Sequence, residues 1–178
     1  MLQLFLVLHV LGAIFVFGPS VAFTFLASEA RRMPQAGHFA AVVGNAIERK
    51  VVLPGAVVQG VTGAFLIVIG GFDLTQQANR WLVAALVLYA IAIVFAFAVQ
   101  ARNAERMVEL TRTPPLIPAG GALAVGAPAL AGGAPALAGP PGPPPEIAAT
   151  GQQLARGGMF LTGMITLIVI LMVVKPGV

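Results

Sequence analysis

The feature that most constrains this chain is the apolar stretch at residues 2–27, LQLFLVLHVLGAIFVFGPSVAFTFLA, in which no side chain carries a formal charge. A helix needs about 20 apolar residues to cross a hydrocarbon layer of ~30 Å, so the stretch is long enough. A cleaved secretory signal would have lysine or arginine before its apolar residues, whereas here the first basic pair, Arg31 and Arg32, follows them. We therefore expect the stretch to be retained as a membrane-spanning helix.

Three further apolar stretches pass the same length test, at residues 51–72, 81–100 and 157–174. Of the 178 residues, 58% are hydrophobic and 9% are charged, whereas a water-soluble domain has about a quarter of its residues charged. The lack of cysteine excludes disulfides, thiolate catalysis and cysteine-ligated metal clusters. We predict an all-α membrane protein, in which residues 1–178 form a single antiparallel bundle of four transmembrane helices.

The basic residues beside the spans predict which way the bundle faces. Eight of the ten lie in the connections after the first and third spans, and two, Arg80 and Lys175, lie on the other side. The eight are Arg31, Arg32, Arg49, Lys50, Arg102, Arg106, Arg112 and Arg156. Because basic residues are retained on the cytoplasmic side, we expect both termini outside the cell and the two longer connections inside it. The same placement predicts contact with lipid headgroups and no binding of nucleic acid.

The two cytoplasmic connections differ in composition. In residues 38–50, HFAAVVGNAIERK, apolar side chains recur at helical spacing while Asn45, Glu48 and Arg49 lie elsewhere around the helix. This pattern predicts a short interfacial helix on the cytoplasmic leaflet. Residues 114–150 are rich in proline, glycine and alanine and contain GAPALAG twice in succession. We expect a cytoplasmic linker there, or alternatively a segment that packs on lipid or on a neighbouring subunit.

One ionisable side chain, that of His9, is placed inside the membrane by these span assignments. Intramembrane ionisable residues are costly and usually face the bundle interior or a polar pathway, so His9 is the leading candidate for a functional residue. Gly12 lies on the same helix face and leaves room for a planar ligand such as haem b, or for another helix. We expect His9 to form a neutral hydrogen bond across helices, with Gln59 or Thr62 as partner, or to ligate haem iron. A metal site or proton relay is the third interpretation.

The second span carries a stripe of small and polar residues. Gly55, Gln59 and Gly63 recur every four residues, and Thr62 lies beside them. A small–polar–small stripe is typical of close helix packing reinforced by a side-chain amide. We predict a helix-packing face here, with contact to a ligand as the alternative.

Nothing in the sequence predicts catalysis. The chain has no Walker-type loop, no GxSxG elbow and no HExxH motif. His38 is predicted to lie in a cytoplasmic connection, too far from His9 for a catalytic dyad. Trp81, at the outer start of the third span, is expected to belong to the interfacial aromatic belt.

Three segments of the sequence resemble a known family. They are LHVLGA in the first span, ERKVVLPGAVVQGVTGAFL entering the second and RWLVAALVLYAIAIV in the third. With them the chain resembles the bacterial predicted integral membrane proteins grouped as domain of unknown function 2269, over roughly residues 2–112. More distantly, it is similar to four-helix membrane proteins of the copper-resistance protein D and HemJ types. The resemblance implies a four-helix fold in the bacterial cytoplasmic (inner) membrane.

The HemJ-type resemblance also implies a candidate ligand. In those proteins a histidine in the first helix is taken to bind b-type haem, and His9 matches that position. They also use a lysine in a later helix, and the spans of this chain contain none. The resemblance therefore implies a fold and one ligand position, without the oxidase activity.

Two functions are compatible with the sequence. The first is a non-catalytic accessory or stabilising subunit of a larger membrane complex, embedded in the lipid bilayer and packed against other subunits or a second copy of itself. The alternative is a b-type haem-binding redox membrane protein with His9 as axial ligand and no other metal. We favour the accessory subunit, because one usable histidine and no second ionisable group within the membrane leave little chemistry to perform.

Overall fold

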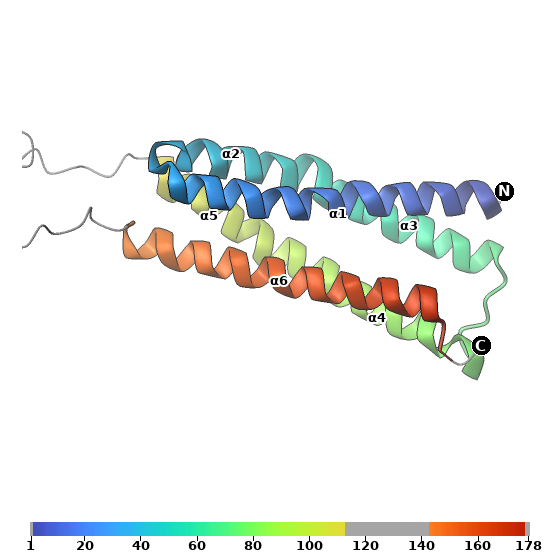
Figure 1. The fold of residues 1–178 in the computed structure, drawn as a ribbon. Coiled ribbons are helices and arrows are strands. Elements are labelled where there is room, and N and C mark those ends of the chain that lie inside the picture. Colours follow the sequence, from blue (N-terminus) through green and yellow to red (C-terminus); the bar gives the residue numbers. More distant parts are fainter. Residues whose placement is uncertain (1, 113–142, 177–178) are drawn as a thin grey trace, which may run out of the picture.

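The structure is a computed structural model that describes residues 2–112 and 143–176. In these ranges every regular element is helical, as predicted (Figure 1). The α-helices are α1 (Leu2–Arg32), α2 (Gly37–Ile47), α3 (Leu53–Ile69), α4 (Arg80–Phe95), α5 (Ala101–Arg112) and α6 (Pro145–Val174). Most of the segment predicted as a linker, 114–150, lies outside the described residues, and its last residues belong to the start of α6.

Four helical segments are long and apolar enough to span a membrane, which confirms the predicted number of spans. They lie at Leu2–Pro19, Gly37–Ile69, Gln77–Arg112 and Pro145–Val174. In the second, a π-helical turn joins α2 to α3, so the helix predicted over residues 38–50 continues into the span. The helix α6 begins well before residue 157, where the fourth span was predicted to start. Proline is tolerated in its first turn, because the amide groups there have no hydrogen-bond partner within the helix.

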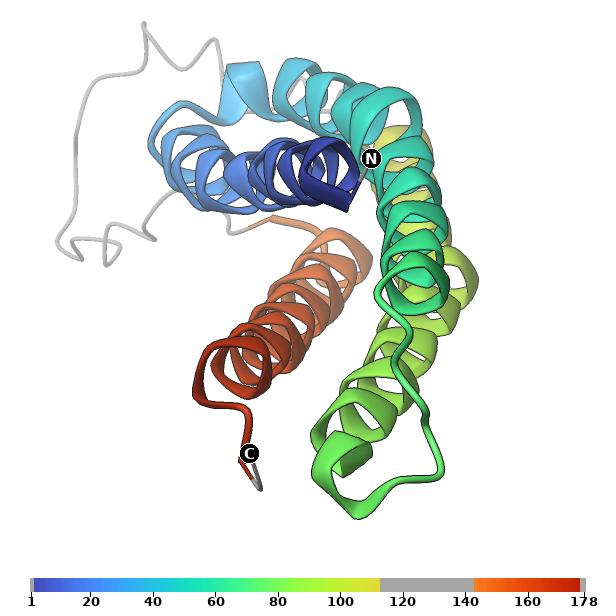
Figure 2. The same ribbon diagram turned by 90° about the vertical axis from the view of Figure 1, so that its right-hand side faces the viewer.

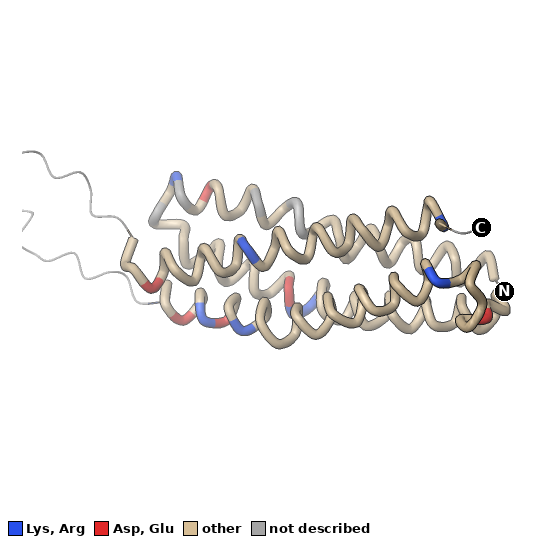
Figure 3. The backbone as a smooth tube through the Cα atoms, turned by 90° about the horizontal axis from the view of Figure 1, so that it is seen from below, with Lys and Arg blue, Asp and Glu red and all other residues tan. Residues whose placement is uncertain are grey.

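The helices form two antiparallel pairs that meet at one end. α1 packs along α3 and α4 packs along α6, while α2 packs on α5 and α5 on α6 at the end away from the termini. Toward the end that carries both termini the two pairs diverge (Figures 1 and 2). Charged residues gather at the opposite end, as Figure 3 shows. The helix ends that lead into the two longer connections therefore share the charged end of the bundle, while its orientation across the membrane stays a prediction.

The two pairs are joined by a small apolar cluster. Leu53 at the start of α3 packs against Ala96 and Ala101 of the third spanning helix, and all three are buried. Leu161 of α6 covers this contact. We call this cluster the crossing. Each of the two long helices contains a π turn next to it, at Glu48–Val52 in one helix and at Ala96–Gln100 in the other.

Glycine allows the paired helices to approach closely. A β-carbon on Gly12 of α1 would lie 2.6 Å from Oε1 of Gln59 on α3. In the other pair, a β-carbon on Gly157 of α6 would collide with the side-chain oxygen of Gln100. In both pairs, therefore, a glutamine from one helix lies directly on a glycine of its partner, where any larger residue would push the helices apart.

The structure corrects the placement of Trp81. This residue lies at the start of α4, next to the turn between α3 and α4, which we call the outer turn because the predicted orientation puts it outside the cell. The side chain of Trp81 is only 6% exposed. The ring meets Phe72 edge-on, with the ring centroids 6.5 Å apart, and the ammonium nitrogen of Lys175 lies 6.0 Å from the Trp81 ring centroid. Trp81 therefore packs between the outer turn and the end of α6 instead of facing the interface.

The outer turn between α3 and α4 is organised by one carboxylate. Asp73 accepts hydrogen bonds from the amide of Thr75 at 2.9 Å, from its hydroxyl at 2.7 Å and from Gln76 at 3.3 Å. Asn79 donates to the Asp73 carbonyl at 2.8 Å. Because the hydroxyl and amide of Thr75 favour the charged form, they lower the pKa of Asp73 below its ordinary value.

This shift predicts a pH dependence of the outer turn. A carboxyl whose pKa is lower in the folded state stabilises that state at neutral pH, and the contribution is lost as the pH falls through the folded-state pKa. An NMR titration of the Asp73 carboxyl carbon should give a midpoint below the ordinary value of about 3.9. Thr75→Val should raise the midpoint, while Thr162→Val leaves it unchanged. A midpoint at or above the ordinary value in the unmodified chain would contradict the turn geometry.

A second prediction concerns the glycine contacts. Gly12→Ala should lower the free energy of unfolding by about 1 kcal/mol, the low end of the range for overpacking, because the added methyl group must displace the end of the Gln59 side chain. Gly163→Ala is the control, since nothing lies within 4 Å of a β-carbon at that position of α6. Thermal unfolding of the purified chain in detergent measures both variants. Equal stability of the two variants would show that α1 and α3 do not pack as described.

Candidate functional site

Polar side chains meet between α1 and α3, in the half of the bundle nearer the termini. Nδ1 of His9 lies 3.0 Å from the hydroxyl oxygen of Thr62. Thr62 and Gln59 are each 8% exposed, and the His9 side chain is partly buried. The structure thus brings together three of the residues that the sequence analysis singled out.

Helical spacing explains how this cluster forms. Residues three and four apart lie on one face of a helix, so the small and polar stripe of α3 faces the stripe of α1 that contains His9. The two helices run antiparallel, so residues late in α3 face residues early in α1 (Figure 1). The facing pairs are Val16 with Gly55, Gly12 with Gln59 and His9 with Gly63.

The hydrogen bonds of Thr62 define the proton position on His9. The Thr62 hydroxyl lies 3.0 Å from the carbonyl oxygens of both Val58 and Gln59 in its own helix. A hydroxyl has one hydrogen, and a threonine within a helix commonly donates it to such a carbonyl, which leaves the oxygen to accept from His9. In that arrangement Nδ1 of His9 carries the proton, and Nε2 keeps its lone pair.

The geometry limits what the cluster can hold. His9 supplies one free ring nitrogen, and its Cε1 lies 3.1 Å from the position of a β-carbon on Gly63, so the ring packs close to α3. Among the described residues there is no group of three or more histidine, aspartate or glutamate side chains that could hold a metal ion. His9 could therefore supply at most one ligand to a haem iron, and a second ligand would have to come from outside this cluster.

Gln59 takes a different role from that of a histidine partner. Its side-chain oxygen is buried, has no hydrogen-bond partner among the described residues and lies against Gly12. The contact is of the weak type in which a backbone Cα–H faces an oxygen. Gln59 therefore marks the closest approach of α1 and α3, next to the pair formed by His9 and Thr62.

Tyr89 forms a polar contact between the two helix pairs. Its hydroxyl, on α4, donates a hydrogen bond to the carbonyl of Ala56 on α3. A β-carbon on Gly60 would lie 2.8 Å from the same hydroxyl, so glycine is needed for the ring to reach α3. The tyrosine therefore ties the two pairs together one helical turn from the crossing.

Sequence reasoning missed one buried residue. Glu48 was predicted to lie outside the apolar face of a surface helix, but its side chain is only 6% exposed. Its Oε1 atom is buried without a hydrogen-bond partner among the described residues. The prediction failed because it treated residues 38–50 as a surface helix with one covered face, whereas α2 packs against both α1 and α5, so that positions outside the apolar face are covered as well.

These features define the class of the protein as a multi-pass integral membrane protein with a polar interhelical cluster. Comparison with known families matches residues 3–114 to the family described as "Predicted integral membrane protein (DUF2269)". The chain belongs to this family, which confirms the predicted resemblance. No curated protein and no solved structure matches the chain. The more distant resemblance to copper-resistance protein D and HemJ-type proteins gains no support from these comparisons.

The hydrogen bond between His9 and Thr62 can be tested directly. Thr62→Val removes the acceptor, so Nδ1 should lose its preference for the proton, which ¹⁵N NMR of the labelled ring would detect. The free energy of unfolding should fall by about 0.6–2 kcal/mol, the range for interhelical hydrogen bonds in membranes.

Thr166→Val is the matched control for this experiment, because the Thr166 hydroxyl donates only to a carbonyl of its own helix. An unchanged His9 spectrum in Thr62→Val would rule out the described contact.

Proposed function

We propose that this protein is a non-catalytic accessory subunit that stabilises a larger membrane assembly by packing its spanning helices against other membrane helices. One observation carries the proposal: the chain itself buries only 6% of the first span and 6% of the fourth span. In a membrane this surface meets either lipid or other helices. The side chains on α6 favour helices.

One strip on the uncovered side of α6 is built from small and hydroxyl-bearing residues, and large apolar side chains such as Met159 and Val173 are exposed on the rest of it. Gly158, Thr162 and Thr166 are spaced four apart, and a β-carbon on Gly158 or Gly163 would meet nothing within 4 Å. The two threonine hydroxyls each donate at 2.8 Å to a carbonyl of α6 itself. Small residues let a second helix approach closely in a membrane, where large apolar residues would suffice against lipid. This face supports docking of a partner helix.

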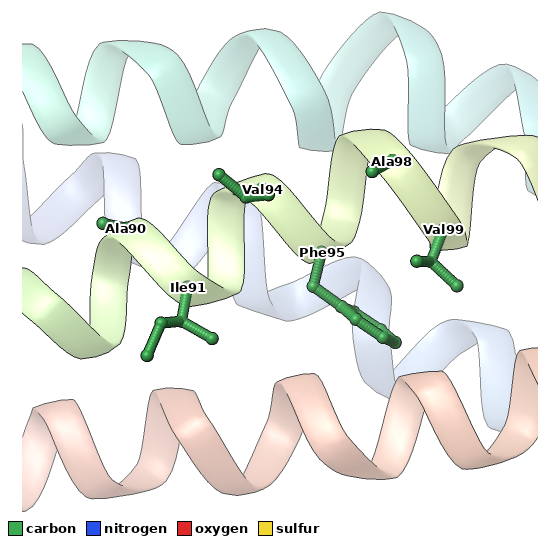
Figure 4. Close-up of a pocket in the computed structure, with 6 residues that line it drawn as sticks. All are labelled: Ala90, Ile91, Val94, Phe95, Ala98 and Val99. Carbon is green, nitrogen blue, oxygen red and sulfur yellow. The ribbon is translucent and has the colours of Figure 1, made fainter.

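A groove on α4 supports the same function. It has a volume of about 490 Å³ and is lined by Ala90, Ile91, Val94, Phe95, Ala98 and Val99. Figure 4 shows these side chains on the two sides of α4, some toward α6 and some toward the other helix pair. Such an apolar lining suits the side chains of another membrane helix better than a polar substrate.

The proposal includes the location and orientation of the protein. Lys and Arg beside the spans lie mainly at the end opposite the termini (Figure 3). Under the positive-inside rule this supports a cytoplasmic position for that end. A bacterial inner membrane as the site of action rests on the resemblance to the bacterial family alone.

Cross-linking from single cysteines tests the accessory function, because the chain contains no cysteine of its own. The variant Thr162→Cys is treated in native membranes with a membrane-permeant bismaleimide. It should give one discrete adduct with another membrane protein, and that protein should also co-purify with the chain in stoichiometric amount. Adding Gly163→Leu should reduce the adduct yield several-fold, because the larger side chain blocks close approach.

Val61→Cys is the control for that experiment. Val61 is an apolar residue of α3 that is 49% exposed and lies away from the small-residue face of α6. It should give no discrete adduct. A chain that purifies alone and gives no Thr162→Cys adduct would exclude the accessory function.

A second candidate function is a b-type haem-binding redox protein. It is favoured by the His9 geometry, since a metal-ligating histidine usually donates its other ring N–H to a nearby acceptor, as Nδ1 does here to Thr62. Bound haem would supply one-electron chemistry, and His9 would hold the iron through Nε2. An absorption spectrum of the purified protein should then show a Soret band that is lost in His9→Ala. A colourless protein would exclude this function and leave the accessory function in place.

A further inference from the structure

Glu48 is a carboxyl group buried inside a membrane protein. Its side chain is 6% exposed, although the next two residues along the chain, Arg49 and Lys50, are both exposed. Its Oε1 atom is buried without a hydrogen-bond donor among the described residues. Burial of an ionised carboxylate without a partner is very costly, so something must neutralise the group.

The neighbouring basic residue does not neutralise it. The guanidinium of Arg49 pairs instead with Glu105 of α5. Besides Arg49 and Glu105, charged or titratable groups lie on Glu48's own turn and on the helices packed around it. They are Lys50, His9, Glu29, Arg32, His38, Arg102, Arg106, Glu109 and Arg112, together with Arg31, whose side chain lies outside what the structure describes. Glu29 and Arg32 pair with each other at 3.1 Å, and His38 bonds Thr111 at 3.1 Å. Within the described part of the chain, none of these groups forms an ion pair with Glu48.

The backbone at this position is also unusual. Glu48 opens the π turn, and its carbonyl accepts from the amide of Leu53 five residues later. Single π turns within α-helices are rare and occur often at functional sites. Because Leu53 is part of the crossing, Glu48 is one π turn away from the contact that joins the two helix pairs.

We propose that Glu48 is a proton-binding site, whose carboxyl group is neutral while the crossing is closed. A proton is the ligand that best fits a single buried carboxyl that has no basic partner among the described side chains, since a metal ion would need several oxygen ligands. Release of the proton places an unpaired negative charge beside the crossing. The two helix pairs then loosen, or water enters, until the charge is solvated.

Infrared spectroscopy of the intact protein in lipid nanodiscs tests this assignment without requiring access of a reagent to the site. A protonated carboxyl has a C=O stretching band that an ionised carboxylate lacks. The unmodified chain should show this band at neutral pH, and Glu48→Gln should lose it. Glu109→Gln, which changes an exposed glutamate of α5, should retain it.

The alternatives give different results. No protonated-carboxyl band at neutral pH, or a band of equal intensity in Glu48→Gln, would overturn the proposal. Loss of the band on adding sodium at constant pH would show a cation site instead and would also overturn it. Thermal unfolding provides the second measurement: Glu48→Gln, a neutral isostere, should unfold at an unchanged or higher temperature, whereas a strongly destabilised variant would show that the ionised form is needed.

Discussion

Lipid as the solvent is the constraint on which the rest of this structure depends. The hydrocarbon layer offers no hydrogen bonds, so each spanning segment satisfies its backbone within its own helix. Lipid also removes most of the hydrophobic drive between helices, so contact comes from close packing. Glycines therefore lie where α1 meets α3 and where α4 meets α6. Gln59 rests on Gly12 in the first pair, and Gln100 rests on Gly157 in the second. The chain is held together by fit along narrow stripes, without a large apolar core.

The same solvent decides how polar groups are treated. Hydroxyl groups in the spans turn back to their own helix, as Thr162 and Thr166 do, and only a few polar side chains cross between helices. His9 reaches Thr62 within one helix pair, and Tyr89 reaches Ala56 between the pairs. Each polar side chain that reaches a neighbouring helix therefore ties together two helices that apolar contacts alone would hold loosely. This division explains why polar residues in the bundle are few but concentrated at helix contacts.

Local pattern was enough to predict the helices, and long-range geometry was not. Uninterrupted apolar stretches predicted four spans, and four-residue spacing predicted that Gly55, Gln59 and Gly63 share a face. The pairing of this face with His9 depends on how two helices pack, which a single sequence does not encode in a local pattern. Glu48 was misplaced because the packing of α2 against both α1 and α5 is likewise a long-range feature that no local pattern encodes. The family assignment, by contrast, rested on motif-length segments and was confirmed.

The π turns have a mechanical consequence for the two long helices. In each π turn a backbone amide bonds the carbonyl five residues earlier, from Leu53 to Glu48 in one long helix and from Ala101 to Ala96 in the other. Each turn therefore contains one residue more than the α-helical turn it replaces. One residue corresponds to about 100° of rotation in an α-helix. In each long helix, the side chains on one side of the π turn are thus rotated about the helix axis relative to those on the other side. Evolution can re-aim either half by inserting or deleting a single codon, leaving the other half in place.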